Sequence, residues 1–87
     1  MINKSATKAC EISWSNGNTT VLHVGSNRNT GNAIVWQVVW KNGKPGKSSR
    51  ITGANIAKLA AEIAQYVPAD GAFVYRNAAA MTAITKE

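Results

Sequence analysis

One thiol and one imidazole, Cys10 and His23, are the side chains best suited to covalent catalysis in this 87-residue sequence. An imidazole within hydrogen-bond reach of a thiol activates it as a nucleophile. Residues 9–14 alternate so that Cys10, Ile12 and Trp14 share an apolar face, and the hairpin predicted for residues 9–24 places His23 on the other face. We therefore expect Cys10 in the core and no covalent catalysis.

Glu11 and His23 share the polar face of that hairpin, where a carboxylate can contact an imidazole across the strands. Two interpretations stay open, part of a catalytic dyad or a surface pair. The sequence offers no third group to orient the dyad. A surface pair contributes little to stability, and we favour it.

A Gly-Lys-Ser string at Gly46–Ser48 raises the question of a phosphate-binding loop. The P-loop needs another glycine five residues before the second one, and that position is Lys41. It also needs a helix that starts at the lysine, whereas the predicted helix starts near Ala54. One Cys and one His offer no zinc-ligand spacing. We expect no enzymatic activity, no metal and no cofactor.

The net charge of +6 belongs to the middle of the chain. From Ile12 to Ala61 there is no acidic residue, and the densest stretch is Lys41–Arg50, where a positive charge recurs every third residue among Gly, Pro and Ser. Such a loop presents its cations to solvent and suits a polyanion or an acidic protein surface. The alternative is that the charges of Lys41–Arg50 only keep the protein soluble and bind no partner.

The three tryptophans also have two interpretations. Trp36 and Trp40 lie four residues apart on a predicted strand and thus on one face. They are core residues, or one of them is exposed beside the basic loop as an aromatic platform for bases or for a protein partner. The candidate partner-binding residues are Arg28, Trp40, Lys41, Lys44, Lys47 and Arg50.

The first predicted element is a hairpin in which residues 9–14 pair with residues 19–24. A three-residue loop at residues 15–17, with Gly17 in the left-handed region, pairs Ile12 with Thr20 and Cys10 with Leu22. A two-residue loop at Asn16-Gly17 mixes polar and apolar partners, so we prefer the first register.

Two further strands are predicted after the turn-rich residues 25–32. Residues Ala33–Trp40 form the strongest strand, and both of its faces are largely apolar. That pattern is typical of a central strand covered on both sides, or of one with a face left for a partner. A short strand is expected around Ser48–Ile51.

The second half of the chain is mainly helical. Apolar residues from Ile56 to Val67 recur at helical spacing, which predicts an amphipathic helix over Ala54–Val67 that Pro68 ends. A strand at Ala72–Tyr75 follows, and then a short helix capped by Asn77 that docks through its apolar side chains, Met81 and Ile84.

Together these patterns predict one α+β domain spanning residues 1–87. We expect an antiparallel sheet of about four strands, packed on one main amphipathic helix, with the C-terminal segment near an edge or on the other face. The N-terminal residues lack the apolar stretch of a signal peptide and no 18-residue apolar run occurs, so we expect a cytoplasmic location.

Residues Trp36–Ala64 resemble the arm-binding domains of phage integrases. The resemblance rests on Trp36-Gln37-Val38-Val39-Trp40-Lys41-Asn42-Gly43-Lys44, then Arg50 and the helix. It implies a three-stranded sheet that lays one face in the DNA major groove. The sequence departs from that family at Ile51, where the family has an aromatic residue, and at Pro45-Gly46, which interrupts the strand that contacts DNA.

In size and layout the whole chain is similar to the small phage-encoded anti-CRISPR inhibitors, which implies stoichiometric docking on a protein that handles nucleic acid. We accordingly expect a non-enzymatic binding protein of this kind, acting through the basic loop in a bacterial host cytoplasm. Direct binding of DNA or RNA is the alternative, and self-assembly as a homodimer through Ile34–Trp40 is a further one. No membrane partner is expected.

Overall fold

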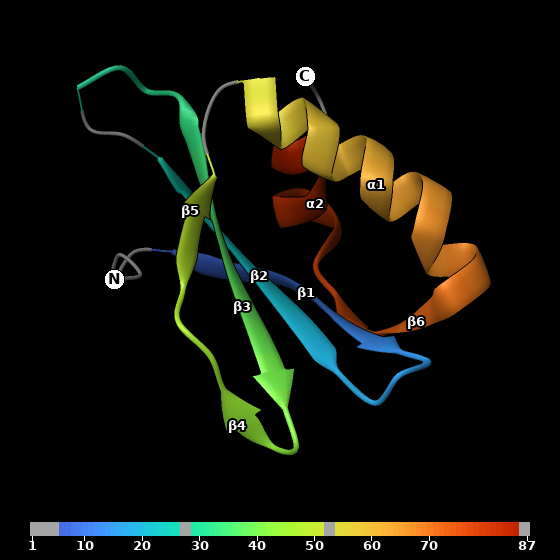
Figure 1. Cartoon of the computed structure of the whole chain (residues 1–87). Helices are drawn as coiled ribbons and strands as arrows, with labels where there is room; N and C mark the ends of the chain where they lie inside the picture. Colours follow the sequence, from blue (N-terminus) through green and yellow to red (C-terminus); the bar gives the residue numbers. More distant parts are fainter. Residues whose placement is uncertain (1–5, 27–28, 52–53, 86–87) are drawn as a thin grey trace.

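The computed structural model describes residues 6–26, 29–51 and 54–85 and shows an α+β fold in two layers (Figure 1). Six antiparallel strands form one sheet in the order β4-β3-β2-β1-β6, and β5 pairs with β3 beside β4. The elements are β1 (Thr7–Trp14), β2 (Thr19–Ser26), β3 (Ala33–Lys41), β4 (Lys44–Pro45), β5 (Ser49–Ile51), α1 (Ala54–Asp70), β6 (Gly71–Arg76) and α2 (Ala78–Thr85).

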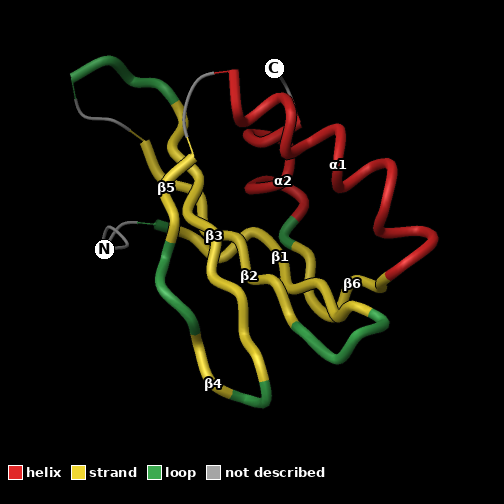
Figure 2. The backbone as a smooth tube through the Cα atoms, in the orientation of Figure 1, coloured by secondary structure: helices red, strands yellow, loops and turns green. Residues whose placement is uncertain are grey.

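The strand count exceeds the expected four because the basic loop folds back along β3. The short segment β4 pairs with the C-terminal end of β3, and β5 pairs with residues 35–37 of β3; a loop joins the two segments (Figure 2). The N–H of Gly46 donates to the carbonyl of Val39 at 2.9 Å, just after β4 ends. Pro45 has no N–H to donate, which an edge segment tolerates.

The β1–β2 hairpin has the register that the polarity of its residues predicts. Ile12 pairs with Thr20 and Cys10 with Leu22. The N–H of Trp14 donates to the carbonyl of Asn18 at 2.9 Å, which closes a three-residue loop, and Gly17 has a φ of 91°. Glycine adopts this left-handed backbone without steric cost.

Both helices pack on one face of the sheet, and the core lies between the two layers (Figure 1). α1 contributes the apolar side chains that its spacing predicts, and they are buried. The cluster comprises Ala9, Cys10, Ile12, Leu22, Val35, Ile56, Leu59, Ile63, Val67, Ala80, Met81 and Ile84.

The expectation that Pro68 ends α1 is wrong, because the helix continues to Asp70. A proline in the last turn removes only one backbone donor. The end of the helix is fixed by the sheet instead: the N–H of Ser15 donates to the carbonyl of Asp70 at 2.8 Å, and Gly71 opens β6 opposite Trp14.

α2 forms as predicted but lies in a different place from the one expected. The N–H of Ala80 donates to Oδ1 of Asn77 at 3.2 Å, so Asn77 caps the helix, and Met81 and Ile84 are buried. We expected this segment near an edge or on the other face. It lies beside α1 on the same face, because its apolar side chains enter the same core cluster.

No described element packs on the opposite face of the sheet, which we call the open face. This face carries alternate residues of β3, and Ile34, Trp36 and Val38 are nevertheless buried on it. β3 is an interior strand with partners on both edges. Among the described helices, none has the length and apolarity needed to cross a membrane.

Candidate functional site

The basic loop begins with a tight turn between β3 and β4. Asn42 has a φ of 54° and Gly43 a φ of 77°, and the flanking residues Lys41 and Lys44 are paired. Positive φ at both central residues is the signature of a type I′ turn, in which Asn-Gly is the favoured pair. The turn lies at the end of the sheet away from the helices, at the bottom of Figure 1.

Three lysines gather at this end of the hairpin, and we call Lys41, Lys44 and Lys47 the lysine tip. Together with Val39, Pro45 and Gly46 they line a shallow hollow of about 370 Å³. All three are exposed, and none forms an ion pair with any residue that the structure describes. Like charges directly opposite one another on paired strands are destabilising, so the Lys41–Lys44 pair opposes folding.

The other predicted site residues do not join this cluster. Residues paired across strands point to the same face. Arg50 pairs with Trp36, which lies on the open face together with Trp40. The two predicted site residues Trp40 and Arg50 therefore lie on the open face, opposite to the lysine tip. Arg28 lies outside the described residues.

The open face is organised as rows of side chains that run across the strands. One row is Arg50, Trp36, His23 and Lys8, from β5 to β1. The next is Val38, Val21, Glu11 and Tyr75, from β3 to β6. A third begins with Pro45, Trp40 and Thr19.

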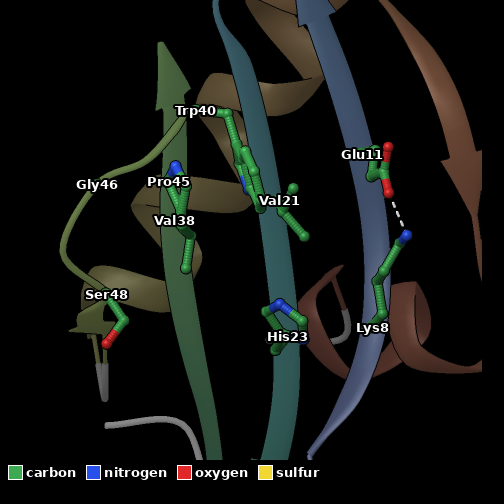
Figure 3. Close-up of a pocket in the computed structure, with 9 residues that line it drawn as sticks. All are labelled: Lys8, Glu11, Val21, His23, Val38, Trp40, Pro45, Gly46 and Ser48. Carbon is green, nitrogen blue, oxygen red and sulfur yellow. Dashed lines mark hydrogen bonds and ion pairs between the residues drawn. The ribbon is translucent and has the colours of Figure 1, made fainter. Parts of the chain in front are cut away.

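A groove of about 460 Å³ lies between the first and third rows (Figure 3). Its floor is Val21 and Val38, which are 7% and 8% exposed, and Trp40 stands over it with 36% of its surface exposed. Pro45, His23 and Lys8 complete its walls. We call this the Trp40 groove.

At the β1 end of the open face, a positive and a negative side chain lie side by side. The ammonium of Lys8 forms an ion pair with the carboxylate of Glu11 and lies 4.8 Å from the centre of the Tyr75 ring. Burial, and to a smaller extent the neighbouring charge of Lys8, lower the pKa of His23 below its usual 6.5. His23 is therefore neutral at pH 7.

The structure brings neither Cys10 nor Glu11 into a pair with His23. Glu11 pairs with Lys8, and Lys8 rather than Glu11 lies opposite His23. Cys10 is buried on the helix-covered side, away from His23. Burial raises the pKa of the Cys10 thiol to about 11, an effect that the charge of Arg76 partly offsets. Within the described ranges, no cluster of three or more His, Cys, Asp or Glu side chains could hold a metal.

The alternation in the sequence placed Glu11 and His23 on one face, which is the open face, but it did not place Lys8 and Tyr75 there. Two irregularities explain why. A bulge in β1 between Lys8 and Cys10 turns Lys8 onto the open face, and a second one leaves Val74 unpaired between Phe73 and Tyr75. A bulge inserts one residue and so shifts the alternation from which faces are predicted.

Comparison of the chain with protein-family models, with curated proteins and with solved structures finds no match in any of the three.

Proposed function

We propose that this chain is a non-enzymatic nucleic-acid-binding protein that contacts phosphates through the lysine tip. The observation that carries the proposal is the Lys41–Lys44 pair, held face to face by the type I′ turn with Lys47 beside it. This arrangement costs stability in the free protein. A bound polyanion removes that cost, because its phosphates screen the ammonium groups from one another.

The distribution of acidic residues supports the same proposal. Glu11 is paired with Lys8, while Glu62 and Asp70 belong to α1 in the helical layer. The described part of the hairpin and of β5 carries cations only, Lys41, Lys44, Lys47 and Arg50. A surface with one sign of charge raises the local concentration of the opposite charge and speeds its association.

The position of the lysine tip favours a long, narrow partner. The β3–β4 hairpin is two strands wide and extends away from the helices (Figure 1). β4 is the edge segment beside β3 there, and β2 flanks β3 on its other side. Flexible lysine stems are therefore able to reach around β4. A phosphate backbone meets these requirements.

A binding measurement with single-charge variants tests the proposal. Fluorescence anisotropy with a labelled 20-nucleotide probe at low salt is expected to show binding by the native chain. Lys44→Gln is expected to weaken it severalfold, because one phosphate contact is lost. Lys58→Gln removes the same charge from the exposed face of α1 and is expected to change affinity by less than about twofold. Equal losses in both variants would show only non-specific attraction, and absence of binding at low salt overturns the proposal.

Docking on a protein, as an inhibitor of a complex that handles nucleic acid, is a second candidate. It is favoured by one observation, the exposure of Trp40 over an apolar floor, because tryptophans in such pockets are frequent hot spots of protein interfaces. Co-purification after nuclease treatment separates the two candidates. A stable protein partner that survives nuclease and is lost in Trp40→Ala supports docking, and its absence removes this candidate.

A further inference from the structure

We infer that the Trp40 groove binds single-stranded nucleic acid, with bases against Trp40 and the apolar floor and phosphates along the row from Arg50 to Lys8. The inference rests on the proposed function and names its substrate class. The Trp40 groove lies on the opposite side of the hairpin from the lysine tip, and its role is to contact the bases of the strand.

The spacing of the cationic row fits a short single strand. Arg50 and Lys8 lie at its two ends, separated by β3 and β2. Strands in a sheet are about 4.8 Å apart, so these ends are about 14 Å apart. An extended single strand spans this distance with a few nucleotides. His23 lies between them, and its imidazole is a hydrogen-bond partner for a phosphate.

The groove beside this row has the properties of a base-binding surface. Trp40 offers an exposed ring at the rim, and the floor of Val21 and Val38 is apolar and already desolvated. The next row ends in Tyr75, which is 43% exposed. Aromatic rings on an uncovered sheet stack bases with little regard to sequence, because every base has an apolar face.

The same features disfavour a duplex at this surface. In a double helix the faces of the bases are stacked on one another, and only their edges are accessible in the grooves. A tryptophan ring that lies over a shallow floor contacts base faces, so it requires an unstacked nucleotide. The groove, open along the sheet and bounded by Pro45 on one side and His23 on the other, admits an extended strand.

Glu11 limits the affinity of the open face. Its carboxylate holds the ammonium of Lys8, and that ammonium also lies over the ring of Tyr75. A phosphate that approaches Lys8 must compete with the carboxylate. Removal of the Glu11 charge is therefore expected to tighten binding of a single strand, whereas removal of Trp40 is expected to weaken it.

The test compares a labelled 12-nucleotide oligothymidylate with a 12-base-pair duplex of mixed sequence, by anisotropy and by quenching of tryptophan fluorescence. A 12-nucleotide oligouridylate distinguishes DNA from RNA. We expect quenching on binding of the single strand, about a tenfold loss of its affinity in Trp40→Leu, and less than a twofold loss for the duplex. Glu11→Gln is expected to raise affinity for the single strand about threefold.

The outcomes separate this inference from the proposed function. If Lys44→Gln weakens binding but Trp40→Leu and Tyr75→Leu do not, the proposed function stands and the groove is not a base-binding site. If the duplex binds as tightly as the single strand, or quenching is absent, the inference is also overturned. If no probe binds the native chain, both fail. Circular dichroism establishes that each variant is folded, and Tyr75→Leu serves as the second aromatic variant.

Discussion

The ring of Trp36 lies directly over Gly25 on the open face. A Cβ built on Gly25 would be 2.9 Å from Cζ3 of the ring and 3.1 Å from Cη2. Because the glycine leaves this space, the ring packs against Gly25 and is only 5% exposed although no helix covers it. On the open face the ring of Trp36 therefore fills the space over Gly25, whereas the Trp40 groove lies further along the strands.

Gly25→Ala is therefore expected to destabilise the fold. The added methyl group must displace a confined ring, and overpacking of this kind costs about 1–3 kcal/mol. Urea denaturation measures the loss. Ser26→Ala, at the exposed neighbouring position, is the control and is expected to change stability by less than about 0.5 kcal/mol. Equal stability of the two variants would contradict the packing described for Trp36.

Lys44→Glu is expected to raise stability and weaken nucleic-acid binding at the same time. The substitution replaces the repulsive Lys41–Lys44 pair by an attractive one on the same face. Opposite charges at such a position contribute roughly 0.2–1 kcal/mol. Thermal unfolding at low salt measures the gain and anisotropy measures the binding. A variant that is less stable than the native chain would show that the two lysines do not repel.

The Cys10 thiol is expected to resist modification in the folded protein. Its pKa of about 11 keeps it protonated at pH 8, and only the thiolate reacts rapidly. A disulfide reagent is expected to react at once with the chain in urea and slowly without it. Since the unfolded thiol ionises near pH 9 and the folded one near pH 11, folding stability is expected to decrease as pH rises above 9. Rapid reaction in the absence of urea would contradict the burial of Cys10.

His23 gives binding a pH dependence with a predictable sign. Its pKa is lowered in the folded chain, so it is neutral at pH 7 and gains a charge on acidification. Its row also holds Arg50 and Lys8, with Glu11 in the next row. Affinity for a single strand is expected to rise as the pH falls below 6.5, and the extra gain is expected to be lost in His23→Gln.

The same shift has the opposite effect on folding. A lowered pKa in the folded state means that the unfolded chain binds more protons, so stability falls as pH decreases through about 6.5. Acid is thus expected to tighten binding while it lowers the free energy of unfolding. An affinity that does not depend on pH in the native chain would place His23 outside the binding surface.

Local patterns in the sequence predicted much of the fold. The polarity of Cys10, Ile12 and their partners fixed the register of the first hairpin, and apolar spacing located the core face of α1. The cap at Asn77 was also predictable, since its side chain bonds a backbone donor three residues away. Each of these depends on residues close together along the chain.

The features that the sequence did not predict depend on contacts between residues far apart along the chain. α2 occupies the same face as α1 because Met81 and Ile84 complete a core that β1, β2 and β3 also build. The bulge that turns Lys8 to the open face is set by its pairing with β2. The basic loop is divided, with Trp40 on the opposite face from the lysine tip, because side chains alternate along β3 and the chain reverses at the Asn42-Gly43 turn.

The salt dependence of binding tests the proposed function most directly. The logarithm of the association constant for a single strand, plotted against the logarithm of salt concentration, has a slope that counts the phosphates contacted. We predict a slope that is about two units shallower when the whole lysine tip, Lys41, Lys44 and Lys47, is replaced by glutamine, at about 0.7 units for each lysine. An unchanged slope in that variant, or no binding by the native chain at low salt, would contradict the account.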